Sequence, residues 1–234
     1  IQELTNCSFK SVHNGIMHAC GHDVHTANLL GVAMILSELK NEWEGQVKFI
    51  FQPSEEKMPS GAETMIREGV LENPRINCLL GMHVHPELEV GNVGFCAGKF
   101  MASADEIYLT VKGKGGHAAQ PQNFISPLLI ASKVLLALDE LNDKDFPVVL
   151  SFGKIIAEGA TNVIPEKAEI AGTLRCFDEK KRSEIHHKIN SICKEIAQAS
   201  KGECEVKILK GNPVLTNHEL LTNYCKDVAA NTMV

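Results

Sequence analysis

The sequence lacks an excess of positive charge, long apolar runs, internal repeats and low-complexity linkers, and the first two absences exclude whole classes of protein. Acidic side chains number 29 against 23 basic ones, for a formal net charge of -6, which argues against a nucleic-acid-binding surface. No run is long and apolar enough to span a membrane, and no signal peptide is visible. We therefore expect neither a nucleic acid nor a membrane among the partners.

The eight cysteines lack the regular spacing of a disulfide framework. Several lie in apolar segments, which is typical of reduced thiols in a cytosolic protein. The sequence therefore predicts a cytoplasmic protein. Hydrophobic residues make up 44% of the 234 residues, which is enough for the core of one large or two small domains.

Side chains that bind metals are densest between His18 and Thr26, in the stretch His-Ala-Cys-Gly-His-Asp-Val-His-Thr. Only Gly21 separates Cys20 from His22, and a glycine in a turn can let two side chains converge on one ion without a Cβ clash. Thiolate and imidazole groups are good ligands for zinc and other borderline divalent metals. Apolar residues of helical period follow, so we expect a metal-binding loop at the start of a helix. A polar loop with chance histidines is the alternative, which this density disfavours.

Two further groups of polar side chains follow apolar runs, residues 46–52 and 77–82, that the pattern predicts to be buried strands. Glu55 and Glu56 come after the first run, and His83 comes after the second. Carboxylates and imidazoles beyond buried strands are placed where open α/β sheets gather their sites. A solvated acidic turn is the alternative for the glutamate pair.

The motif His-Ala-Cys-Gly-His-Asp-x-His-Thr resembles the metal-binding signature of the M20 metallopeptidases. It is most similar to the amidohydrolase branch, which includes hippurate hydrolases, auxin-conjugate hydrolases and N-acetyl-diaminopimelate deacetylases. The resemblance implies two divalent ions per subunit (Zn, Mn, Co or Ni) and Glu55 as the general base. The implied metal ligands are Cys20, His22, Glu56 and His83. The last ligand of the family, a histidine, has no counterpart here, so we expect part of the catalytic domain to be missing.

From about residue 101 the pattern changes to β-α-β-β-α-β, which is a ferredoxin-like unit. The resemblance implies that this unit is a satellite domain inserted into an α/β, zinc-peptidase-like catalytic domain. We therefore predict three segments. Residues 1–100 form the first part of the catalytic metal-binding domain, residues 101–212 form the satellite domain for dimerisation, and residues 213–234 return to the catalytic domain.

Three polar residues of the second segment stand out. His117 follows a glycine-rich loop, Asn162 lies in a loop before Pro165, and Arg175 ends a strand. Without further information, His117 reads as part of a surface loop, Asn162 as a turn residue and Arg175 as a solvated arginine. The resemblance implies that His117 binds and polarises the scissile carbonyl. It also implies that Asn162 and Arg175 contact the substrate, with Arg175 gripping its carboxylate by two hydrogen bonds.

The resemblance further implies a homodimer, formed through an edge strand at 148–153 and a helix at 124–142. In that dimer His117 serves the metal site of the partner. We thus predict a metal-dependent amidohydrolase acting on N-acyl amino acids or small peptides. The alternatives are a dipeptidase or carboxypeptidase of the same family and, from another class, a non-catalytic metal-binding interaction module with a degraded peptidase fold.

Overall fold

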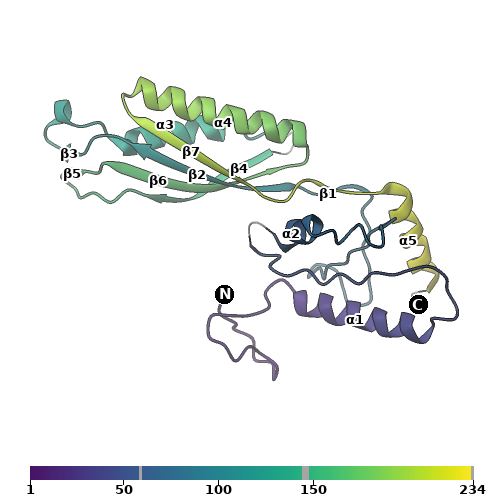
Figure 1. Cartoon of the computed structure of the whole chain (residues 1–234). Coiled ribbons are helices and arrows are strands. Elements are labelled where there is room, and N and C mark those ends of the chain that lie inside the picture. The colour runs from purple at the N-terminus through teal and green to yellow at the C-terminus, as the bar shows by residue number, and fades with distance from the viewer. Residues whose placement is uncertain (58–59, 144–147, 233–234) are drawn as a thin grey trace. The chain divides into compact units, whose positions relative to one another are not determined.

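The computed structural model describes residues 1–57, 60–143 and 148–232 (Figure 1). The chain divides into two compact units, residues 1–94 and residues 95–234. None of the described helices is long and apolar enough to cross a membrane.

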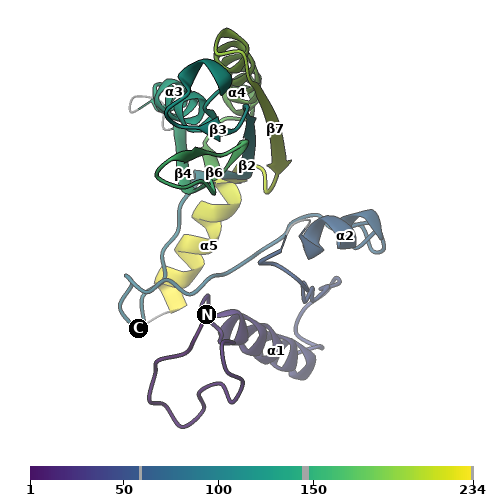
Figure 2. The ribbon, with the colours of Figure 1, turned by 90° about the vertical axis from the view of Figure 1, so that its left-hand side faces the viewer.

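The second unit contains the predicted β-α-β-β-α-β order. Its antiparallel sheet has the strand order β4-β6-β2-β7, and two helices cover one face of it (Figures 1 and 2). The elements in chain order are β2 (Ser103–Lys112), α3 (Pro127–Asp139), β4 (Val148–Ile156), β6 (Lys167–Cys176), α4 (Glu179–Ala199) and β7 (Glu203–Lys210). The predicted strands and helices of this unit are confirmed to within a few residues, and β4 lies at an edge as expected.

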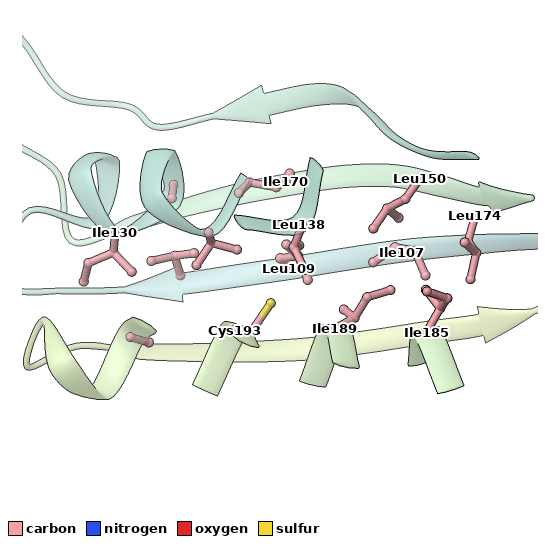
Figure 3. Close-up of a cluster of buried hydrophobic side chains, with 14 of the residues drawn as sticks. Ile107, Leu109, Ile130, Leu138, Leu150, Ile170, Leu174, Ile185, Ile189 and Cys193 are labelled. Carbon is pink, nitrogen blue, oxygen red and sulfur yellow. The ribbon is translucent and has the colours of Figure 1, made fainter. Parts of the chain in front are cut away.

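The core of this unit lies between the sheet and the two helices. Along β2, Ile107, Leu109 and Val111 are buried while the side chains between them face outward, as the period of a strand requires. Figure 3 shows Ile185 and Ile189 of α4 pointing at the sheet residues. Burying a side chain of this size contributes about 1.5–3 kcal/mol. Every buried apolar side chain of the described residues lies between Ile107 and Ala197.

A charged cluster is buried where β2 begins. Asp105 is 1% exposed and Arg182 of α4 is 5% exposed. The Asp105 carboxylate accepts hydrogen bonds from Arg182 Nε at 2.9 Å, from Arg182 Nη2, from His186 Nε2 at 2.7 Å and from the Gly211 amide at 3.1 Å. The cluster therefore joins β2, α4 and the segment that follows β7.

The chain enters and leaves this sheet side by side. Strand β1 (Gly98–Met101) pairs with β8 (Leu215–Asn217), and α5 (Glu219–Thr232) follows β8. Adjacent entry and exit points are what insertion into another domain requires. Residues 213–234 group with the second unit, while the division into three domains stays a prediction.

The first unit contains the helices α1 (His22–Glu38) and α2 (Gly61–Arg67). The prediction of buried strands at 46–52 and 77–82 is wrong. Both runs are irregular, and Val47 and Leu80 are 48% and 67% exposed. Apolar composition does not make a strand by itself, because a ladder needs a second backbone. The described residues of this unit offer none to these runs.

Candidate metal centre

Gly21 sets the directions of Cys20 and His22. Its φ of 76° is left-handed, and a Cβ at this position would lie 2.4 Å from Val84 Cγ2. Both features favour glycine over any other residue. His22 is the first residue of α1, so the two side chains leave the backbone on either side of a tight turn. The predicted loop at a helix start is confirmed.

His83 meets Cys20 although 63 positions separate them. Its Nε2 lies 3.4 Å from Cys20 Sγ. Its Nδ1 lies 2.6 Å from the Val84 carbonyl oxygen, which can only accept, so Nδ1 carries the hydrogen and the Nε2 lone pair faces the thiol. Together with His22, these residues present three ligand atoms within 4.8 Å of one another.

Glu55 and Glu56 also lie close to His22. His22 Nε2 lies 3.5 Å from Glu55 Oε2 and 3.7 Å from Glu56 Oε1. The turn that carries the pair is tied to the start of α2. The Gly61 amide donates to the Ser54 carbonyl at 3.4 Å, and a Cβ on Gly61 would lie 1.8 Å from the Pro53 carbonyl oxygen. The sequence therefore folds so that both carboxylates face the histidine.

The two carboxylates also act on Cys20. Burial raises the pKa of its thiol, and the negative charges of Glu56 and Glu55 and a hydrogen bond with Glu56 raise this pKa further. A thiol in such surroundings needs a cation to become a thiolate ligand, because the cation offsets the carboxylate charge. The acidic pair and the thiol are thus complementary to a bound divalent ion.

The separations fit a metal ion. Ligand atoms at about 2.0–2.3 Å from a tetrahedral zinc lie roughly 3.5 Å from each other. The Cys20–His83 pair at 3.4 Å and the His22–Glu56 pair at 3.7 Å have such separations. His22 belongs to both groups of possible ligands. One nitrogen lone pair binds one ion, so a second ion would need further ligands of its own.

His25 is a residue of the motif to which the sequence assigned no role. Its Nε2 accepts a hydrogen bond from the Val84 amide at 3.0 Å. Its ring lies 4.3 Å from the His83 ring and 5.5 Å from the His22 ring, between centroids. Burial lowers the pKa of His25, and His83 and His22 lower it further. The signal in the sequence was its spacing, since residues three apart share one face of a helix.

In the second unit, the structure brings the segments of His117 and Asn162 together. His117 lies in β3 (Gly116–His117), which pairs with β5 (Val163–Ile164), and the turn η1 (Pro121–Asn123) follows. The Ala118 amide donates to the Asn162 carbonyl at 3.0 Å. His117 Nδ1 accepts from the Ala119 amide at 3.2 Å, so a neutral ring carries its hydrogen on Nε2. A short ladder, rather than a free loop, presents this imidazole.

Arg175 lies in the four-stranded sheet, at the end opposite to the one where β2 leads into the His117 segment. Lys112, which precedes the His117 segment, pairs with Lys167, whereas Arg175 pairs with Ala104. Eight residues along β6 span about 26 Å at 3.3 Å each. Within this unit, Arg175 therefore does not meet His117 or Asn162.

Three comparisons with known proteins bear on this site. A family model described as "Peptidase family M20/M25/M40" matches residues 2–233. The N-acetyl-L-cysteine deacetylase of Bacillus subtilis (strain 168) is 37% identical over 233 residues, which cover 98% of this chain and 55% of that protein. The N-acyl-L-amino acid amidohydrolase of Geobacillus stearothermophilus is 37% identical over 223 residues, or 94% of this chain and 60% of that protein.

A solved structure agrees with these relatives. The YxeP protein of Bacillus subtilis, described as a dinuclear metal binding peptidase from M20 family, has a TM-score of 0.80 at 35% identity, over 99% of this chain and 59% of that chain. The α/β fold of the matched part is therefore shared. The chain spans a little over half the length of the curated relatives given above.

Proposed function

Because this chain belongs to peptidase family M20/M25/M40, we propose that it carries the metal-binding part of a hydrolase that cleaves the amide bond of N-acyl amino acids. One observation carries the proposal: a thiol, two imidazoles and two carboxylates converge at the start of α1. The names of the two relatives given above, a deacetylase and an amidohydrolase, support the same class of substrate.

The proposed site holds two divalent ions, as the description of the YxeP structure supports. The ligands contributed by this chain are Cys20, His22, Glu56 and His83. Bound divalent cations supply Lewis acidity for attack on an amide carbonyl. The negative charges of Glu56 and Glu55, which raise the pKa of the Cys20 thiol, support a shared role of the thiol and the acidic pair in binding a cation.

Glu55 is the proposed general base. Its carboxylate lies 3.5 Å from a proposed ligand atom and is 48% exposed, so an attacking water can reach it. Glu55 takes a proton from that water and returns it to the leaving amine. The adjacent position of Glu56 lets one carboxylate bind while its neighbour moves protons.

His117 is the proposed donor to the carbonyl oxygen, because its Nε2 carries the hydrogen when Nδ1 accepts from Ala119. Such a donor stabilises the negative charge that develops on this oxygen. Asn162 contacts the substrate beside it, and Arg175 binds the substrate carboxylate with its planar fork.

Along β6, about 26 Å separate Arg175 from Lys167, the residue that lies beside the start of the His117 segment. One chain is therefore unable to present both His117 and Arg175 to one substrate. We therefore propose that the second unit is an inserted satellite domain that forms a homodimer, in which His117 serves the partner. The edge strand β4 and helix α3 supply the interface, since Ile155, Leu129 and Leu136 are 51%, 65% and 73% exposed. Exposed apolar side chains at a sheet edge are a template for pairing.

The test is metal-dependent hydrolysis by the full-length protein. Metal is removed with a chelator and restored with Zn²⁺, Mn²⁺, Co²⁺ or Ni²⁺, and release of amino acid is measured from N-acetyl amino acids, benzoylglycine and dipeptides. We expect hydrolysis of acyl amino acids only with metal. A clear preference for dipeptides would favour a dipeptidase. Metal binding without hydrolysis of any substrate would favour a non-catalytic module.

A further inference from the structure

The three imidazoles at the start of α1 do not have equivalent surroundings. His22 and His83 each direct a ring nitrogen at thiol or carboxylate atoms. His25 instead uses its Nε2 to accept the Val84 amide hydrogen at 3.0 Å. A lone pair used in this way is not available to a metal ion, so His25 has a task other than ligation.

The segment that carries His83 has few other attachments. Residues 77–84 lie outside the helices and strands. Among the described residues they make no backbone-to-backbone hydrogen bond. A segment without ladder bonds relies on side chains to fix its backbone. The end of the segment is attached by the His25 bond to Val84, by the contact of His83 Nε2 with Cys20 Sγ, and by the close approach of Val84 Cγ2 to Gly21. Of these, the His25 bond is the one that holds the backbone.

His25 is a suitable anchor because it sits on a helix. It lies one turn into α1, and its own amide donates to the Gly21 carbonyl at 3.2 Å. His22, three residues earlier, shares its helix face. The imidazole therefore connects a rigid element that carries His22 to an irregular segment that carries His83, across 59 positions of sequence.

We infer that His25 is a positioning residue, which holds the Val84 amide and thereby keeps His83 at ligand distance from Cys20 and His22. The inference rests on the proposed function for its metal-binding part. The hydrogen bond also fixes the tautomer of His25, with its hydrogen on Nδ1. Residues that orient metal ligands typically account for about 10–100-fold in metal affinity when they are replaced.

Two substitutions in the full-length protein separate positioning from ligation. His25→Phe keeps a ring and removes the acceptor, whereas His25→Gln keeps an acceptor oxygen near the place of Nε2. The matched control is His13→Phe, which makes the same change at an exposed histidine of the same unit. Zn²⁺ affinity is measured by competition with a chromophoric chelator. We expect a loss of about 10–100-fold for His25→Phe, near-complete recovery for His25→Gln, and no loss for the control.

A second measurement needs no metal. Hydrogen exchange of the Val84 amide is followed by NMR in the metal-free protein, and we expect it to become faster in His25→Phe but not in His25→Gln. The inference is overturned if His25→Phe exchanges and binds Zn²⁺ like the wild type. Equal losses of affinity in both variants, with unchanged exchange, would also overturn it, because His25 would then be a ligand. If the exchange result holds while the wild type binds no metal, the positioning role stands and the proposed function fails.

Discussion

In the second unit each long strand has a neighbour and the core is closed between sheet and helices, whereas in the first unit residues 46–52 and 77–82 have no ladder partner among the described residues. The contrast extends to the helices. Five residues of α3 and six of α4 are buried, while α1 has no buried residue. The unit that contains the candidate metal ligands is thus the one in which the smaller share of residues is buried.

The difference shows that the buried core and the candidate metal ligands lie in separate parts of this chain. Packing holds the second unit together, as expected where apolar side chains alternate along paired strands. In the first unit, a few polar contacts around His22, His25 and His83 hold the site, and metal binding can add to its stability because an ion binds the folded arrangement alone. Substitutions in the two units should therefore have different consequences.

The largest effect is expected for the proposed base. Glu55→Gln keeps the shape of the side chain but cannot take a proton, so turnover of the full-length protein should fall by about 10²–10⁴-fold. Metal content and thermal stability should remain, because Glu56 is the proposed ligand and neither residue is in the core. Turnover is measured beside Glu63→Gln, an exposed carboxylate of α2. Normal turnover in Glu55→Gln would show that the base has been misassigned.

The next largest effect is expected for His117, the proposed donor to the carbonyl oxygen. Removal of one donor to the carbonyl oxygen typically costs about 10²–10³-fold, so His117→Ala should lose activity to this extent. His187→Ala, at an exposed position of α4, serves as the control.

Mixing His117→Ala with Glu55→Gln then separates the two arrangements. A heterodimer should recover part of the activity, since one site combines an intact Glu55 with the intact His117 of the other chain. Subunit exchange is verified by mass spectrometry of differently labelled chains. No recovery after verified exchange would place His117 in its own subunit or outside catalysis.

A stability effect without a chemical one is expected at the buried charged cluster of the second unit. Asp105→Asn removes the buried anionic partner of Arg182, which is 5% exposed and keeps the exposed Glu179 carboxylate at 3.0 Å. Breaking a buried ion pair typically costs about 3–5 kcal/mol. The free energy of unfolding in urea should fall accordingly, while metal affinity stays unchanged. Glu106→Gln, the next residue on the outer face of β2, should have little effect. A fully stable Asp105→Asn protein would contradict this account.

The smallest effect is the acid dependence of the same cluster. Burial alone raises the pKa of the Asp105 carboxyl, but hydrogen bonds from Arg182, His186 and the Gly211 amide outweigh burial and hold this pKa below its ordinary value of 3.8. A carboxyl group whose pKa is lower in the folded state than in the unfolded state stabilises the protein fully at pH values above its unfolded-state pKa. This stabilisation is lost as the pH falls through the folded-state pKa.

The unfolding free energy of the wild type should therefore drop more steeply in acid than that of Asp105→Asn. Urea midpoints between about pH 5 and about pH 2 measure both slopes. Parallel slopes would mean that Asp105 is not linked to acid unfolding, and Glu106→Gln should keep the slope of the wild type.

Much of the second unit could be predicted from sequence, because its pattern and its structure follow the same local rules. Alternation from Ile107 to Val111 makes β2 a half-buried strand, and the helical period of Ile185, Ile189 and Cys193 makes α4 amphipathic. The same reasoning gave a wrong prediction for the runs at 46–52 and 77–82, which do not form strands. Their composition is that of buried strands, but burial depends on neighbours that local sequence does not specify.

For the candidate metal centre, the sequence by itself determined the residue types, the left-handed glycine at 21 and the start of α1, since ligand chemistry and backbone sterics are local properties. Only the tertiary structure decided that His83 meets Cys20, that His25 holds Val84, and that Arg175 lies at the opposite end of the sheet from His117. These relations join residues far apart in the chain. They are set by how turns, helices and strands meet in space, and no spacing within the sequence encodes such a meeting.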